Sequence, residues 1–178
     1  MWDMMRRNLQ RGVLADPDAG TPPPGIVPAV REPAGEVELL GAQLREETQR
    51  LFDGALRIAV VPTGSCNACE SELETLLGPF HDLERHGLVF VDTPRHADAL
   101  VVVGPVTRQL EESLHLAEAA TPRPRWIVAL GDCACDGGFC RDSFAVLGGV
   151  PASLEVAVRI PGCPPRPEDI LRAFLGAL

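Results

Sequence analysis

The chain has 178 residues, of which 46% are hydrophobic and 4% are aromatic, and its formal net charge is −9. This length suits one domain with a sizeable core. The acidic charge argues against a general nucleic-acid-binding role, which needs clustered basic residues. No run of about 18 apolar residues occurs, so we expect no membrane-spanning segment. Six cysteines in a chain of intracellular type indicate metal or redox chemistry before a disulfide framework.

The amino-terminal 35 residues are predicted to lie outside the main domain, which we place at residues 36–178. Residues 1–13 carry apolar side chains on one helical stripe and arginines on the other faces. This pattern fits either a frayed tail or a short basic amphipathic helix that docks on a partner or a membrane surface. Residues 16–35 are rich in proline and glycine and are predicted to form an extended arm. We expect no export signal, because no apolar segment follows the paired arginines.

The rest of the chain alternates short apolar runs with amphipathic segments. We predict strands at residues 56–61, 88–91, 99–103, 126–130 and 156–160. We predict helices at residues 36–52, 70–77, 107–120 and 167–177, with a short helical piece at 82–86. Strands that alternate with helices in this way predict an α/β fold, in which helices cover both faces of a mostly parallel sheet.

Three of the predicted strands lead directly into loops that combine cysteine with glycine or proline. The cysteines in these loops are Cys66, Cys69, Cys133 and Cys163. Ligands of open parallel sheets bind outside the carboxyl ends of the strands, so we expect the four thiols to converge there. Cys66 and Cys69 lie between a strand and a helix amino terminus, where backbone N–H groups and the helix dipole are expected to favour thiolate.

The Cys66-x-x-Cys69 pair by itself fits three kinds of site: a dithiol redox pair, a zinc site and an iron–sulfur site. A thioredoxin-like dithiol enzyme that uses this pair leaves Cys133 and Cys163 unexplained. Structural zinc sites usually draw on two closely spaced ligand pairs, whereas these two cysteines are isolated from each other. Four thiolates from separate loops suit a [4Fe–4S] cluster. The pattern therefore favours an iron–sulfur site.

Three motifs, taken together and in order, resemble a known family. They are Cys66-x-x-Cys69, Gly131-x-Cys133-Ala134-x-x-Gly137-Gly138 and Pro161-Gly162-Cys163-Pro164-Pro165. Over residues 55–178 the chain resembles the small subunit of [NiFe] hydrogenases and the related 20 kDa (B) subunit of respiratory complex I. The resemblance implies a flavodoxin-like fold and one [4Fe–4S] cluster on the four motif cysteines.

The resemblance also implies a role in a larger assembly. In this family the cluster relays electrons to or from the active site of a large partner subunit, so we expect this chain to have no complete active site or catalytic residues of its own. A second, ferredoxin-type iron–sulfur subunit and membrane subunits are the other expected partners. The complex is expected to lie on the cytoplasmic face of the membrane.

The first motif separates two branches of the family. Complex I B subunits typically have two adjacent cysteines there, whereas this chain has the spacing Cys66-Asn67-Ala68-Cys69. That spacing resembles small subunits of membrane-associated hydrogenases of the formate hydrogenlyase type, and so does the loop at residues 104–107. We therefore expect a subunit of such a hydrogenase complex. The alternative within the family is the cluster subunit of a complex I-like NADH:quinone oxidoreductase module.

The remaining polar and sulfur-containing candidates are assigned structural or surface roles. Cys135 and Cys140 are predicted not to bind the cluster, although Cys135 lies only two residues from Cys133. Acidic Glu70 is expected to complement the dipole of the helix that it begins. The four histidines are expected to be solvated residues and not ligands; they are His81, His86, His96 and His115.

Overall fold

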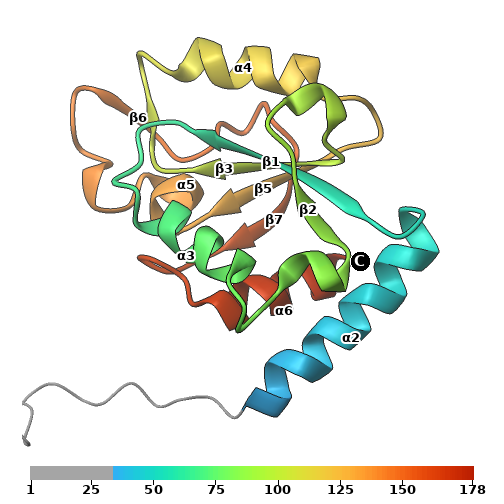
Figure 1. Cartoon of the computed structure of the whole chain (residues 1–178). Coiled ribbons are helices and arrows are strands. Elements are labelled where there is room, and N and C mark those ends of the chain that lie inside the picture. The colour runs from blue at the N-terminus through green and yellow to red at the C-terminus, as the bar shows by residue number, and fades with distance from the viewer. Residues whose placement is uncertain (1–33) are drawn as a thin grey trace, which may run out of the picture. The chain divides into compact units, whose positions relative to one another are not determined.

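The computed structural model describes residues 34–178 (Figure 1). The predictions for residues 1–33, which include the amphipathic segment and most of the proline-rich arm, lie outside the described residues. None of the helices in the described part of the chain is both long enough and apolar enough to cross a lipid bilayer.

A five-stranded parallel sheet forms the centre of the domain. Its strands are β1 (Leu56–Pro62), β2 (Leu88–Phe90), β3 (Ala99–Val103), β5 (Trp126–Leu130) and β7 (Val156–Ile160). They lie in the order β2-β1-β3-β5-β7, and every neighbouring pair is parallel. Counted along the chain, this is the 2-1-3-4-5 order of flavodoxin-like sheets, in which the strand order reverses between β1 and β3. The predicted α/β fold class is confirmed.

The central strand β3 shows why the sequence forms such a sheet. All five of its residues are buried, because apolar layers cover both faces of the sheet at this point. A short, continuous run of valine and leucine is typical of an interior parallel strand. The strand pairs with β1 on one side and with β5 on the other, and Val101 lies opposite Val60 and Val128.

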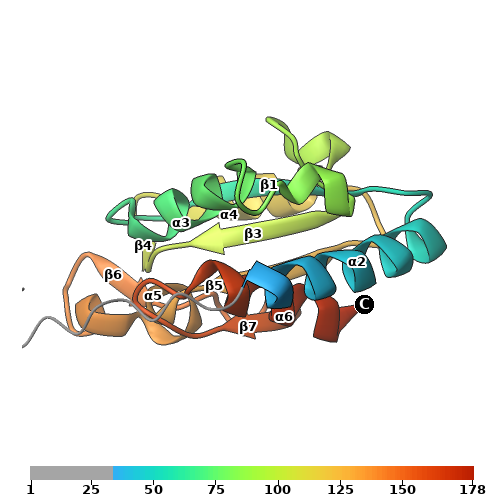
Figure 2. The same ribbon diagram turned by 60° about the horizontal axis from the view of Figure 1, so that its bottom comes forward.

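Helices cover both faces of the sheet (Figures 1 and 2). They are α2 (Ala34–Leu51), α3 (Ala68–Leu77), α4 (Glu111–Ala120), α5 (Asp132–Asp136) and α6 (Pro167–Ala177). Helices α2, α3 and α6 share one core through buried Leu44, Leu76 and Phe174. Helices α4 and α5 contribute Leu114 and Ala134 to a second core on the opposite face.

Shorter elements complete the described part of the chain, and some of them differ from the predictions. They are the 3-10 helices η1 (Leu83–His86), η2 (Pro94–His96) and η3 (Gly138–Cys140), and the antiparallel pair β4 (Val106–Thr107) and β6 (Val146–Gly148). The β4–β6 pair was not predicted, and α4 begins at Glu111 and not at Thr107. The reason is that the backbone N–H and the hydroxyl of Thr107 both donate to the Thr63 carbonyl oxygen, at 3.0 Å each.

His86 was expected to be solvated, and this prediction is wrong. Its side chain is 5% exposed, and its Nε2 atom is buried without a hydrogen-bond partner. The ring packs against Gly41 of α2, where a Cβ atom would come within 2.3 Å of it. This contact joins residues 45 positions apart, so no local sequence pattern could indicate it. His81 is half-buried, and the side chain of His96 is exposed.

Candidate functional site

The carboxyl ends of β1, β3, β5 and β7 lie at one edge of the sheet, where the chain forms a small cavity. Ten residues line it: Ser65, Cys66, Ala68, Cys69, Gly104, Asp132, Cys133, Gly162, Cys163 and Pro164. All four cysteines of the motifs are therefore brought to one cavity, although the first and last are nearly 100 residues apart in sequence. The cavity lies where β1 and β3 mark the reversal of strand order, which is the binding position of flavodoxin-like sheets.

The Cys66-x-x-Cys69 turn is held tightly by its own hydrogen bonds. Helix α3 begins at Ala68, two residues earlier than predicted, so Cys69 lies inside its first turn. Asn67 precedes the helix in a left-handed conformation, with φ of 70°. Across the turn, the Ser65 hydroxyl donates to the Glu70 carboxylate. Besides the predicted interaction with the helix dipole, the Glu70 carboxylate therefore helps to close the turn.

Cys133 is carried by a helix and not by the loop that the sequence suggested. It is the second residue of α5, and the chain then folds back over it as η3. The backbone of Phe139 partly offsets the rise in the pKa of Cys133. A Cβ atom on Gly138 would lie 2.8 Å from the same sulfur, so the absence of a side chain there lets the backbone approach. Cys163, by contrast, is exposed on the loop between β7 and α6.

The thiols of the cavity repel one another when they ionise. Burial, then the Glu70 carboxylate and then the other three cavity thiols raise the pKa of Cys69 to about 12. Burial and the neighbouring thiols, Cys163 first, also raise the pKa of Cys133. The expectation that this turn favours thiolate is therefore wrong for Cys69 in the metal-free chain. Bound metal cations reverse this preference, because a coordinating thiol loses its proton.

The two remaining cysteines differ in position. The sulfur of Cys135 lies 3.7 Å from the Ala129 carbonyl oxygen and packs against the core under α4, away from the cavity. Cys140 is exposed on η3, close enough to Cys133 for its charge to influence that thiol. From the sequence, Cys135 was the cysteine that could most easily replace Cys133 as a ligand, because it lies only two residues away. In the structure, however, it is Cys140 and not Cys135 that raises the pKa of Cys133.

The donor set fits an iron–sulfur cluster. Four cysteines, each with a soft sulfur atom, line the cavity. Gly131 and Gly138 lie where a Cβ atom would come within 2.8 Å of the sulfur of Cys69 and of Cys133, respectively. Within residues 34–178, no three Cys, His, Asp or Glu side chains converge closely enough to hold a single metal ion. Four thiols spread around one cavity could each bind a different iron of a cluster.

The chain belongs to the family of the NADH ubiquinone oxidoreductase, 20 Kd subunit, whose model matches residues 66–177. It is 42% identical over 118 residues to the probable membrane-bound hydrogenase subunit mbhJ of Pyrococcus furiosus, covering 66% of this chain and 71% of that protein. It is 40% identical over 107 residues to the NADH-quinone oxidoreductase B subunit of Citrifermentans bemidjiense, covering 60% of this chain and 62% of that protein.

A solved structure supports the same relationship. The chain matches a subunit of the membrane-bound sulfane sulfur reductase, an archaeal respiratory membrane complex, with a TM-score of 0.60 and 26% identity. The match covers 78% of this chain and 72% of that one. The predicted resemblance is thereby confirmed. The chain is related to subunits of oxidoreductase complexes, and electron transfer within such a complex is the general function that its family supports.

Proposed function

We propose that this chain holds one [4Fe–4S] cluster and relays electrons between it and the active site of a large partner subunit. The observation that carries this proposal is the single cavity lined by Cys66, Cys69, Cys133 and Cys163 at the carboxyl edge of the sheet. The cluster, when bound, supplies one-electron transfer at a potential that its protein surroundings tune. The four thiolates would bind its irons, and the chain itself contributes no complete active site.

The surroundings of the cavity suit this role. The strands beneath it end in fully buried residues such as Val103 and Leu130, which keep water away from the inner side. Cys66 and Cys163 are exposed, so the outer side of the cavity is open to a partner. A thioredoxin-like enzyme is less well supported, because it would use only Cys66 and Cys69 and would leave Cys133 and Cys163, which line the same cavity, without a role.

We infer that the complex is a membrane-associated hydrogenase of the formate hydrogenlyase type. The Cys66-Asn67-Ala68-Cys69 spacing and the 42% identity to the mbhJ subunit support this choice. Its other partners would be a ferredoxin-type iron–sulfur subunit and membrane subunits, with this chain peripheral on the cytoplasmic face. The 40% identity to the NADH-quinone oxidoreductase relative supports the second candidate, a complex I-like NADH:quinone oxidoreductase module.

The test is metal and sulfide analysis of the anaerobically purified chain. We expect about four irons and four acid-labile sulfides per chain, with a broad visible absorbance that bleaches on reduction with dithionite. Zinc without sulfide would overturn the proposal. To separate the two complexes, the large subunit that co-purifies with the tagged chain is analysed for nickel. Bound nickel supports the hydrogenase, and its absence from an active complex that reduces quinone supports the second candidate.

A further inference from the structure

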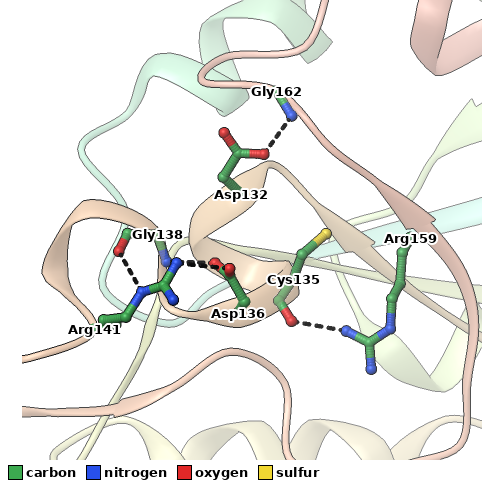
Figure 3. A network of polar contacts seen from close by, with 7 residues as sticks. All are labelled: Asp132, Cys135, Asp136, Gly138, Arg141, Arg159 and Gly162. Carbon is green, nitrogen blue, oxygen red and sulfur yellow. Dashed lines mark hydrogen bonds and ion pairs between the residues drawn. The ribbon is translucent and has the colours of Figure 1, made fainter.

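Asp132 connects the segment that carries Cys133 to the segment that carries Cys163. Its backbone N–H donates to the Gly162 carbonyl oxygen at 2.9 Å. Its Oδ1 atom accepts the backbone N–H of Gly162 at 2.8 Å (Figure 3). The two residues are 30 positions apart. Because each is followed directly by a cavity cysteine, this reciprocal pair links Cys133 to Cys163 through only a few bonds.

This use of the carboxylate is not ordinary helix capping. Asp132 is the first residue of the five-residue helix α5, yet its side chain bonds to the loop after β7 and not to its own helix. The other end of α5 is attached to the same strand, since Arg159 of β7 donates to the Cys135 carbonyl oxygen at 2.9 Å (Figure 3). Helix α5 is thus attached at its first residue to the loop after β7 and near its last residue to β7 itself. Of these two attachments, the one through Asp132 lies beside the cavity.

We infer that Asp132 is a positioning residue that fixes the spacing of Cys133 and Cys163 for the cluster, an inference that rests on the proposed function. A carboxylate that accepts a backbone N–H makes a strong, charge-assisted bond, and such bonds hold ligand-bearing segments in a fixed orientation. Asp132 also lines the cavity, so its negative charge lies next to the cluster position. It therefore acts in two separable ways, through its hydrogen bond and through its charge.

Two substitutions separate these effects. Asp132→Asn keeps an oxygen that can accept the Gly162 N–H but removes the charge, whereas Asp132→Ala removes both. The control is Asp169→Ala in α6, which also removes an acid from the first turn of a helix, but one that bonds Arg172 within that helix. Each variant is loaded with cluster, and three quantities are measured: the rate of iron release to a chelator, the EPR line shape of the reduced cluster and its reduction potential.

We expect Asp132→Ala to release iron at least fivefold faster than the wild type and to broaden the EPR signal. Asp132→Asn should release iron within twofold of the wild-type rate but show a higher potential, since a negative charge beside the cluster is lost. Asp169→Ala should leave all three quantities unchanged.

The positioning role would be overturned if Asp132→Ala released iron at the wild-type rate. It would also be overturned if Asp132→Asn released iron as fast as Asp132→Ala. An unchanged potential in Asp132→Asn would overturn the role of the charge. If Asp132→Ala does not fold, Asp132→Ser, which also removes the carboxylate, replaces it in the release measurement, and Asp132→Asn still decides the role of the charge. A wild-type chain that binds no cluster would instead overturn the proposed function, so the two failures are distinguishable.

Discussion

Gly131 lies directly against the sulfur of Cys69: a Cβ atom at this position would be 2.8 Å from Cys69 Sγ and 3.4 Å from the Gly162 carbonyl oxygen. Its φ of +86° also lies in the left-handed region that favours glycine. One residue at the end of β5 thus contacts the first cysteine segment and the last. The close approach lets three separate segments of the chain surround one small cavity.

The Gly131→Ala substitution should therefore prevent normal cluster binding. The added methyl group displaces the Cys69 sulfur, and the backbone conformation becomes strained. We expect iron content to fall below half of the wild-type value after anaerobic purification. Gly176→Ala in α6 is the matched control, because a Cβ there meets no atom within 4 Å, and its iron content should be normal. Normal iron in Gly131→Ala would contradict the described packing.

Gly41 and His86 provide a test of how α2 is attached to the domain. Because a Cβ at Gly41 would come within 2.3 Å of the His86 ring, Gly41→Ala should destabilise the fold by about 1–3 kcal/mol, the usual cost of overpacking. Chemical denaturation measures this loss. The double variant Gly41→Ala, His86→Ala should be less destabilised than the sum of the single variants, because the smaller side chain makes room. Simple additivity would show that the two residues do not press on each other.

His86 should also make stability depend on pH. Burial first, and then the Arg85 guanidinium, lower the pKa of His86, although Glu38 and Asp82 partly oppose this. The unfolded chain then binds a proton more readily than the folded one. The contribution of His86 is therefore present above its unfolded pKa of about 6.5 and is lost as pH falls below it.

The measurement is the free energy of unfolding at pH 7.5 and pH 5.5. Wild-type protein should lose more stability between these values than His86→Gln, whose side chain does not titrate. Equal losses in the two proteins would show that His86 takes up its proton as easily in the folded state as in the unfolded one.

In the iron-free chain, Cys69 should react slowly with alkylating reagents. Its pKa is raised to about 12, and only the thiolate is nucleophilic, so at pH 8 we expect reaction about a hundredfold or more slower than for a free cysteine. The rate should rise steeply with pH up to that pKa. Mass spectrometry of peptides after timed alkylation measures it. A rate equal to that of a free cysteine would show that neither burial nor the other thiols suppress ionisation.

The sheet and the meeting of the four cysteines at one cavity could be predicted because their signals are local. The buried strands β3 and β5 are continuous apolar runs, and glycine or proline marks where each strand ends. The convergence of the four cysteines then follows from the geometry of parallel strands. The sequence alone was therefore enough to predict that these four cysteines form a single site.

The remaining features depend on contacts between distant residues. Asp132 bonds to Gly162 across 30 positions, and Gly41 excludes a side chain because of His86. Helix α5 is too short to show a helical period, so the segment around Cys133 resembled a loop. The β4–β6 pair has two and three residues, too few for an alternating pattern to be recognised.

The most direct test of the account is a single-substitution series at all six cysteines, read by iron content and by the EPR signal of the reduced protein. The first group, changed to serine, is Cys66, Cys69, Cys133 and Cys163. Serine offers a hard, poorly ionised oxygen in place of a soft thiolate, so each of these variants should lose the [4Fe–4S] signal or retain only a three-iron cluster. Cys135→Ala and Cys140→Ala should keep the signal and the iron content, because four ligands already complete the site. A Cys135→Ala or Cys140→Ala protein without a cluster, beside a Cys133→Ser protein that keeps it, would contradict the assignment.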